Sequence, residues 1–249
     1  MDLSGKVALV TGGSGVLGGH ICRALAVEGC RIAAVYNENR AAAESLVTAL
    51  GEVGSEARPF QCDVTSPKAF ADLVTDVEDA FGGIDILVNA AAFNYFVPFD
   101  DLGSLTHDLW GKILSVNLTG PLIGIKAVVG PMKKRGGGRI VNVSSVAGIA
   151  PTGSSIAYAV SKAGLNHLTR CMAVGLAPDI LVNCVAPGFL EGTKMTAALA
   201  PEYREAVVKG AVLRRPTDKD DVAAQVVAFC RTDSITGQTL AVDAGRVFP

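Results

Sequence analysis

The sequence predicts an α/β fold: one doubly wound parallel sheet of about seven strands with helices on both faces. The first observation is that short apolar runs alternate with segments of helical length, which is the order of β-α-β units. The second is that these runs are apolar almost throughout, as in strands covered on both faces. The third is a glycine-rich turn directly after the first run.

Seven strands are expected along the chain, at 6–11, 31–36, 57–62, 84–89, 139–144, 180–186 and 239–242. With 249 residues, 49% of them hydrophobic, the chain is long enough for one well-filled core. No linker rich in proline, glycine or serine divides it, so residues 1–249 are expected to form a single domain. Such sheets bind ligands at the carboxyl ends of their strands, and functional residues are therefore expected just after each strand.

Composition and charge argue against several functions. The net charge is −2 without long runs of like charge, so nucleic acid is not an expected partner. The start of the chain lacks the features of a secretory signal, and polar residues such as Asn117 and Lys126 interrupt the longest apolar stretch, 113–130. We therefore expect a buried helix there, no membrane span and a cytoplasmic protein. The six cysteines form no C-x-x-C pair and the three histidines are isolated, so no metal site is expected.

The turn TGGSGVLG, Thr11 to Gly18, leads from the first strand into a helical pattern. Glycines allow a tight turn and close approach of the backbone to a ligand, and free N–H groups at a helix start attract a pyrophosphate. An ordinary strand-to-helix turn is the alternative, but the context favours a Rossmann-type dinucleotide site. The predicted contacts in this turn are Gly12, Ser14, Gly15, Val16, Leu17 and Gly18.

Together with later landmarks, this turn resembles the T-G-x-x-x-G-x-G opening of the short-chain dehydrogenase/reductase family. Thr11, Gly12 and Gly18 match, whereas Val16 occupies the place of the middle glycine. The later landmarks, in family order, are Asp63-Val64, Asn89-Ala90-Ala91, Asn117, Ser145, Tyr158 with Lys162, and Pro187-Gly188. The resemblance covers essentially the whole chain and implies a nicotinamide dinucleotide cofactor. Outside the turn, it implies cofactor contacts at Asp63, Val64, Asn89, Ala90, Tyr158, Lys162, Pro187 and Gly188.

Tyr158 and Lys162 are four residues apart in a helical pattern, so both side chains leave one face of the helix. A neighbouring ammonium and a cationic nicotinamide favour the phenolate of Tyr158, which makes it a workable general acid or base. An exposed helix face is the alternative for this pair. Ser145 is expected to hydrogen-bond the substrate oxygen, and the family's thirteen-residue spacing to the tyrosine selects it over Ser144.

The resemblance also implies that Lys162 holds the nicotinamide ribose and that Asn117 orients a water in a proton path. The alternative for Asn117 is a buried polar residue at a helix kink near Pro121.

The residues after the second strand bear on the choice of cofactor. An acidic residue at the end of that strand would bind the adenosine ribose hydroxyls and repel a 2′-phosphate. Tyr36 and Asn37 stand there instead, with Arg40 nearby, which favours NADP(H) over NAD(H). Glu38 opposes this preference, and Arg40 is also explained as a solvated charge at a helix start.

Aromatic residues in the loops after the strands suggest a mainly apolar pocket for a small carbonyl or alcohol substrate. The predicted substrate contacts are Ser145, Phe93, Tyr95, Phe96 and Phe189, and ordinary core packing is the alternative for the aromatics. Residues 190–215 resemble the mobile substrate lid of the family. The helical segments around 104–133 and 157–177 are apolar enough to pack against another subunit. Members of the family that the chain resembles are commonly tetramers or dimers, so we expect a homotetramer or homodimer.

The sequence therefore predicts an NAD(P)(H)-dependent oxidoreductase that interconverts a carbonyl and a secondary alcohol. It is similar to 3-oxoacyl reductases or to ketone and polyol dehydrogenases. Two alternatives stay open: a non-catalytic dinucleotide-binding scaffold or sensor, since a fold does not fix a function, and a redox-neutral epimerase. The intact Asn117, Ser145, Tyr158 and Lys162 weigh against the first alternative.

Overall fold

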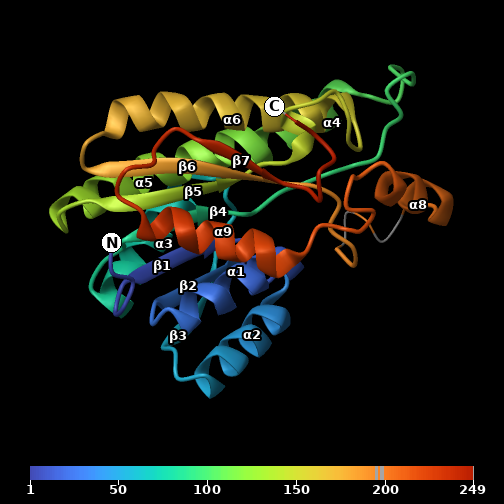
Figure 1. Cartoon of the computed structure of the whole chain (residues 1–249). Helices are drawn as coiled ribbons and strands as arrows, with labels where there is room; N and C mark the ends of the chain where they lie inside the picture. Colours follow the sequence, from blue (N-terminus) through green and yellow to red (C-terminus); the bar gives the residue numbers. More distant parts are fainter. Residues whose placement is uncertain (194–195, 197–198, 249) are drawn as a thin grey trace.

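The structure is a computed structural model that describes residues 1–193, 196 and 199–248 (Figure 1). Seven strands form one parallel sheet in the order β3-β2-β1-β4-β5-β6-β7, which confirms the predicted fold class. The strands are β1 (Val7–Thr11), β2 (Arg31–Tyr36), β3 (Ala57–Gln61), β4 (Ile86–Asn89), β5 (Gly138–Val143), β6 (Ile180–Pro187) and β7 (Thr239–Val242). The strand order reverses at β1 and β4, which is where sheets of this kind bind ligands.

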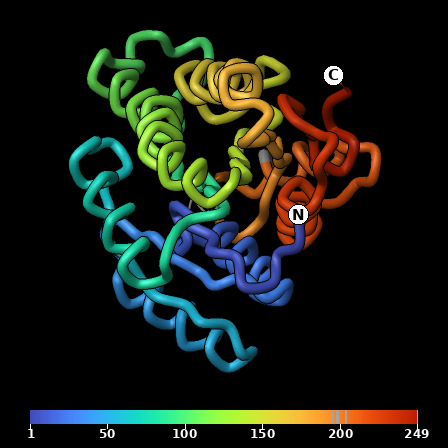
Figure 2. Tube along the Cα trace, turned by 90° about the vertical axis from the view of Figure 1, so that its left-hand side faces the viewer, coloured from blue at the N-terminus to red at the C-terminus, as the bar shows by residue number. Residues whose placement is uncertain are grey.

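Helices cover both faces of the sheet (Figures 1 and 2). On one face lie α1 (Val16–Val27), α2 (Arg40–Glu52) and α9 (Lys219–Arg231); on the other lie α3 (Pro67–Phe81), α5 (Gly120–Lys134) and α6 (Ile156–Leu176). Successive residues of β1 pack on opposite faces of the sheet. Ala8 belongs to the hydrophobic core beside α1, α2 and α9, and Leu9 belongs to the core beside α3, α5 and α6; both are fully buried. This double burial explains why the strands are apolar almost throughout.

A smaller hydrophobic cluster forms beside α4 (His107–Leu114), and Tyr158 belongs to it. Side chains at the helix starts help to set these boundaries: Thr106 caps α4, and Ser155 caps α6. The Ser155 cap bears on the site because its Oγ accepts the backbone N–H of Tyr158 at 3.2 Å. This cap fixes the first turn of α6, which contains Tyr158.

One continuous helical run extends from His107 to Lys134. Within it, α4 passes into the π-helical turn η1 (Ser115–Thr119) and then into α5, so the predicted helix through 113–130 is confirmed. By length and composition the run is apolar enough to cross a membrane, and 39% of its most apolar window is buried. It packs against α3, α6 and the strands β4 and β5, as a helix of a globular core does.

The predicted lid, 190–215, contains residues 194, 195, 197 and 198, which lie outside the described residues. Its described part contains α8 (Pro201–Lys209), which stands away from the sheet at the right of Figure 1. Two hydrogen bonds join the chain at the two ends of this segment: Thr217 N donates to Phe189 O at 2.9 Å, and Lys219 Nζ, at the start of α9, donates to Glu191 O at 2.9 Å.

A buried carboxylate joins three segments at the amino ends of the strands. Asp85 Oδ2 accepts Val7 N at 2.9 Å, and Arg135 makes a two-pronged ion pair with the same carboxylate at 2.9 and 3.1 Å. The side chain of Asp85 is 4% exposed and that of Arg135 is 31% exposed. This end of the sheet is opposite to the expected site.

We expect Asp85→Asn to lower the free energy of unfolding by about 2–3 kcal/mol, because it leaves a partly buried guanidinium without its counter-charge. Urea unfolding followed by circular dichroism measures this loss. Because the carboxylate is far from the carboxyl ends of the strands, turnover at 25 °C should stay within about twofold of the unmutated protein. A loss of stability below about 0.5 kcal/mol would contradict the structural role given to Asp85.

Candidate active site

The turn between β1 and α1 has the geometry of a dinucleotide cradle. Gly12 has a φ of 67°, and a Cβ there would lie 2.9 Å from Ala91 Cα. At Gly18 a Cβ would lie only 2.1 Å from the Gly12 carbonyl oxygen. The helix begins at Gly15 without a side-chain cap or an acidic residue in its first turn. Its first N–H groups are therefore available to an anionic phosphate.

The other predicted cofactor residues follow neighbouring strands at the same end of the sheet. Asn89 ends β4 and is paired in register with Thr11, whose Oγ1 accepts the N–H groups of Ala90 and Ala91 at 3.1 and 3.2 Å. The Asn89 side chain itself is buried and donates to Asn142 Oδ1 at 2.9 Å. Within the sheet it therefore acts as a link to β5, and a ligand would meet the backbone of this segment.

Asp63 and Val64 follow β3, and Pro187 and Gly188 lie at the end of β6. The exposed Asp63 carboxylate accepts two hydrogen bonds from Thr65, and these lower the pKa of that carboxyl. A Cβ on Gly188 would lie 2.6 Å from Thr217 Oγ1 and 2.8 Å from Asp243 Cα. Only glycine fits this close approach without a backbone shift.

After β2, Tyr36 is buried and Asn37 is exposed. Asn39 caps α2 by accepting the N–H of Ala42 at 3.1 Å, and Arg40 is the first residue of that helix. The Arg40 guanidinium is 73% exposed and pairs with Glu44 at 2.7 Å. This exposure fits the interpretation of Arg40 as a solvated charge at a helix start, and it also leaves the guanidinium accessible to the 2′-phosphate of NADP(H).

Ser145, Tyr158 and Lys162 come together at the carboxyl end of β5. Tyr158 and Lys162 lie in the first two turns of α6 and are 8% and 2% exposed. The Lys162 ammonium lies 5.7 Å from the centre of the Tyr158 ring and donates to the carbonyl oxygen of Val143 at 2.8 Å. Tyr158 also forms a side-chain hydrogen bond with Ser145. The pair therefore faces the interior, which contradicts the alternative of an exposed helix face.

Burial is the largest influence on the pKa values of Tyr158 and Lys162. It raises the pKa of Tyr158 above its ordinary value, and the hydrogen bond with Ser145 only partly offsets the increase. Burial also lowers the pKa of Lys162 to about 8, against a smaller opposing effect of Cys184. In the protein alone, burial thus favours the neutral phenol of Tyr158. The expected phenolate depends on Lys162 together with a cationic nicotinamide, so it stays a prediction for the cofactor-bound protein.

The two adjacent serines have different surroundings. Ser144 is 4% exposed, and its Oγ donates to the Lys162 carbonyl oxygen at 3.1 Å. Ser145 is partly exposed and begins the short 3-10 turn η2 (Val146–Gly148), where its Oγ accepts Ala147 N at 3.2 Å. Ser144 therefore holds α6 against β5, while Ser145 faces the Tyr158 hydroxyl.

Sequence reasoning missed Gly148, which lies against the backbone of the catalytic helix. A Cβ at Gly148 would lie 2.6 Å from the carbonyl carbon of Lys162. Asn166 Nδ2 donates to the Gly148 carbonyl oxygen at 3.0 Å from one turn further along the same helix. The backbone of the η2 turn therefore packs closely against the backbone of α6 at Lys162. A glycine after the Ser-Ser pair was the available signal, but only the tertiary contact gives it meaning.

Asn117 lies inside the π-helical turn and is fully buried. Its Oδ1 accepts Phe93 N at 2.8 Å, and its Nδ2 donates to Phe93 O at 2.9 Å and to Ser161 Oγ at 3.1 Å. The side chain therefore joins the loop after β4 to α6, close to Tyr158. The reading of Asn117 as a buried polar residue at a helix irregularity also fits this position.

The predicted substrate aromatics fall into two groups. Phe93 packs in the same hydrophobic cluster as Tyr158, and the Lys112 ammonium lies 4.4 Å from its ring centre. Tyr95 and Phe96 are 58% and 51% exposed on the following part of the loop, and Phe189 is partly buried after β6. Phe93 is therefore the predicted substrate aromatic that packs against the hydrophobic cluster containing Tyr158.

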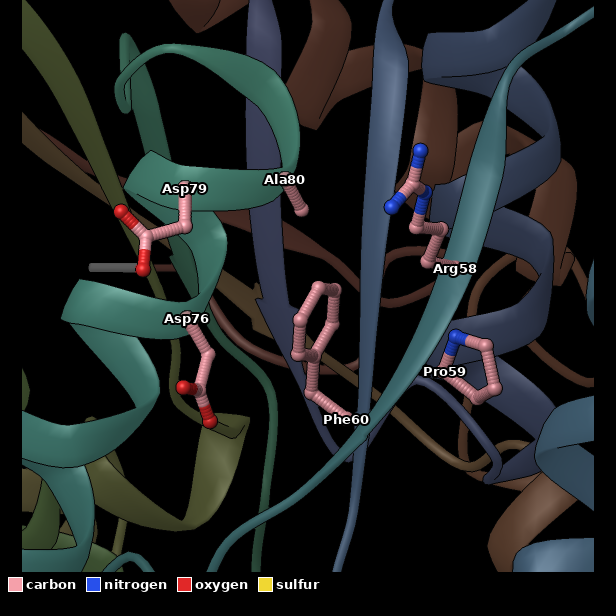
Figure 3. Close-up of a pocket in the computed structure, with 6 residues that line it drawn as sticks. All are labelled: Arg58, Pro59, Phe60, Asp76, Asp79 and Ala80. Atoms are coloured by element: carbon pink, nitrogen blue, oxygen red, sulfur yellow. The ribbon is translucent and has the colours of Figure 1, made fainter.

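Two surface grooves lie outside the cluster. One, of about 450 Å³, lies between edge strand β3 and α3 and is lined by Arg58, Pro59, Phe60, Asp76, Asp79 and Ala80 (Figure 3). The other, of about 240 Å³, lies between the start of α9 and the end of β7. In the part of the chain that the structure describes, no three His, Cys, Asp or Glu side chains gather as metal ligands would.

A nicotinamide dinucleotide fits the residues present. The uncapped start of α1 and the glycine cradle suit its pyrophosphate, and the buried Lys162 has ammonium donors beyond its bond to Val143. Together with the sheet order, these features define a dinucleotide-binding α/β protein.

Comparison with known proteins identifies the family within this class. A family model described as short chain dehydrogenase matches residues 6–204. The chain belongs to this family, the short-chain dehydrogenases/reductases, and is an oxidoreductase of the kind that acts on alcohol or carbonyl substrates with a nicotinamide dinucleotide.

Relatives and solved structures match over nearly the full chain. The dehydrogenase/reductase SDR family member 4 of Mus musculus is 39% identical over 98% of this chain and 88% of its own length. The 3-oxoacyl-[acyl-carrier-protein] reductase of Vibrio cholerae is 36% identical over 98% of each chain. A blue fluorescent protein from a metagenomic library, solved in complex with NADPH, is 32% identical with a TM-score of 0.91 over 100% of both chains.

Proposed function

We propose that the protein is a carbonyl reductase or alcohol dehydrogenase in which Tyr158 is the general acid and base. The observation that carries this proposal is the cluster at the end of β5, in which the partly exposed Ser145 meets the buried Tyr158 and Lys162. When bound, the nicotinamide dinucleotide supplies or accepts the hydride. The residues of the chain then have to orient the substrate, exclude water and move one proton.

In the direction of reduction, Tyr158 gives its hydroxyl proton to the carbonyl oxygen as that oxygen gains negative charge. The raised pKa of Tyr158 keeps the proton in place until then. Ser145 donates a hydrogen bond to the same oxygen, and the Lys162 ammonium stabilises the phenolate left behind. Asn117 belongs to the proposed set as the residue that orders a water for the return of the proton.

The ionisation of Lys162 predicts the alkaline limit of the reaction. Because its pKa is lowered to about 8, the ammonium is present below that pH and is lost above it, whereas Tyr158 keeps its proton through the same range. We expect kcat/KM for reduction to be level below pH 8 and then to fall by up to about tenfold per pH unit. Initial rates between pH 6 and 10 measure this profile. A Lys162→Arg variant with residual activity should lack the fall, and a level profile of the unmutated protein to pH 9.5 would contradict the assignment.

For the cofactor we propose a preference for NADP(H). It is supported by Tyr36 and Asn37 at the place of the acidic residue, and by a solved relative in complex with NADPH. Glu38 is the one nearby residue that favours NAD(H). Titration of the protein with NADPH and NADH, followed by cofactor fluorescence, tests the preference, and tighter binding of NADH would reverse it.

For the substrate we propose a carbonyl compound with an apolar substituent, accepted beside Phe93. The 3-oxoacyl thioesters are one candidate class, supported by the Vibrio cholerae relative, and simple ketones and polyols are the other. A panel of 3-oxoacyl thioesters, aryl and alicyclic ketones, keto sugars and secondary alcohols, followed at about 340 nm with both cofactors, tests the proposal. A cofactor-binding protein that oxidises or reduces none of them would favour a scaffold or sensor instead.

We further propose a cytoplasmic homotetramer or homodimer that assembles through apolar helix faces. Val160 and Val174 on α6 are 42% and 84% exposed, which supports packing against a second copy. Light scattering of the purified protein tests the assembly, and a monomer would contradict it.

A further inference from the structure

Ser161 is a fully buried hydroxyl between the two catalytic positions of α6, and the mechanism above does not use it. Its Oγ donates to the Tyr158 carbonyl oxygen at 2.7 Å and accepts Asn117 Nδ2 at 3.1 Å. It is therefore in contact with the backbone of the general acid and with the side chain of Asn117.

The count of donors and acceptors fixes which way the Asn117 carboxamide faces. A serine hydroxyl has one proton, and in Ser161 that proton is given to the Tyr158 carbonyl oxygen. Toward Asn117 the hydroxyl can then only accept, so it requires the NH₂ end of the amide. With the amide turned over, two oxygen acceptors would face each other in a fully buried place.

This orientation matters because the Asn117 side chain makes hydrogen bonds to both backbone groups of Phe93, its N–H and its C=O. The amide oxygen accepts Phe93 N at 2.8 Å, and the amide NH₂ donates to Phe93 O at 2.9 Å. Both bonds need the same orientation of the amide that Ser161 selects. Phe93 in turn packs in the hydrophobic cluster of Tyr158.

We propose that Ser161 is a positioning residue that orients the Asn117 carboxamide and so holds the loop at Phe93 against the hydrophobic cluster that contains Tyr158. The inference rests on the proposed function for its kinetic consequence only, since the hydrogen-bond chain itself can be tested without turnover. Ser161 acts on the substrate side of the site through Asn117 and does not touch substrate or cofactor itself.

Thr169 on the same helix offers a matched control. Its Oγ1 is also fully buried, donates to the carbonyl oxygen of Leu165 at 2.9 Å, and accepts an asparagine amide, Asn142 Nδ2, at 2.9 Å. Thr169→Val and Ser161→Ala each delete one buried hydroxyl and leave one asparagine N–H without its acceptor. The bonds of Thr169 lead through Asn142 to the side chain of Asn89, whereas only those of Ser161 lead to the backbone of Phe93.

The first test is hydrogen–deuterium exchange of the unliganded protein, followed by mass spectrometry of peptides covering residues 90–97. We expect Ser161→Ala to speed exchange in these peptides about tenfold, because the bonds of Asn117 to Phe93 lose their fixed geometry. Thr169→Val should leave them unchanged. Unchanged protection in Ser161→Ala, or equal loss in both variants, would overturn the proposal.

A second variant keeps the test decisive if Ser161→Ala does not fold. Ser161→Cys replaces the hydroxyl by a weaker acceptor of similar shape, and exchange in residues 90–97 should fall between the rates of the unmutated protein and a tenfold increase. Thermal unfolding shows which variants are folded. Exchange in folded Ser161→Cys equal to that of the unmutated protein would overturn the proposal in that case.

The kinetic test uses a carbonyl substrate that the unmutated protein reduces, at saturating cofactor. Ser161→Ala should raise KM for the carbonyl about fivefold. Because Asn117 is also proposed to order the water that returns the proton, kcat should fall as well, by less than about threefold, while the alkaline limb near pH 8, which belongs to Lys162, stays in place. A change in the pH profile instead would place Ser161 in the proton chemistry and would overturn the positioning role. If no carbonyl is reduced at all, the proposed function fails and the exchange result still decides on Ser161.

Discussion

Replacement of Tyr158 by phenylalanine should lower kcat for the preferred carbonyl by about 10²–10⁴-fold. The ring stays in its hydrophobic cluster beside Ile113 and Ala157, so the fold loses little. The one deleted atom is the hydroxyl oxygen, which carries the hydrogen bond with Ser145 and, in the proposed mechanism, the proton for the substrate. Stopped-flow and steady-state kinetics with NADPH or NADH measure this loss of kcat.

Two controls separate this loss of chemistry from a loss of binding. Cofactor affinity of Tyr158→Phe, measured by fluorescence titration, should stay within about threefold, since the pyrophosphate cradle at β1 and α1 is unchanged. Tyr95→Phe removes a phenol that is 58% exposed on the substrate-side loop, and it should leave kcat nearly unchanged. If Tyr158→Phe binds cofactor and keeps more than about a tenth of the activity, the assignment of the general acid is wrong.

Replacement of Gly18 by alanine should weaken cofactor binding at least about a hundredfold, because the turn cannot keep its shape. The added Cβ would lie 2.1 Å from the Gly12 carbonyl oxygen and 3.0 Å from Gly13 Cα, both backbone atoms. Either α1 moves away from β1 or the cradle opens. We expect a parallel loss of about 2–4 kcal/mol in the free energy of unfolding, measured with urea.

Gly19→Ala is the matched control, one residue further along the same helix. Its Cβ would meet the Arg23 guanidinium at 3.4 Å, and the nearest backbone atom would be 3.8 Å away. Alanine favours a helix more than glycine by about 1 kcal/mol, so stability should stay level or rise and cofactor affinity should stay within about threefold. Equal damage from both substitutions would mean that the crowding at Gly18 is not what shapes the cradle.

The order of the motifs along the chain predicted more of the site residues than any single motif did. The structure brings Ser145, Tyr158 and Lys162 together at the end of β5, the region where parallel sheets carry their ligands. Burial raises the pKa of Tyr158 in the protein alone, and no local pattern predicted this effect, because the desolvation comes from residues distant in the chain. Gly148 and Ser161 also escaped notice, since their partners lie across elements that no local pattern connects.

The sequence by itself determined the alternation of strands and helices, the sheet class and the position of the dinucleotide turn. These follow from periodicity and from the backbone freedom of glycine, which are properties of neighbouring residues. The tertiary structure alone decided the burial of Lys162, the separate surroundings of Ser144 and Ser145, and the orientation of Asn117 between Phe93 and Ser161. Desolvation and the pairing of buried donors with acceptors are set by residues that meet only when the sheet and its helices assemble.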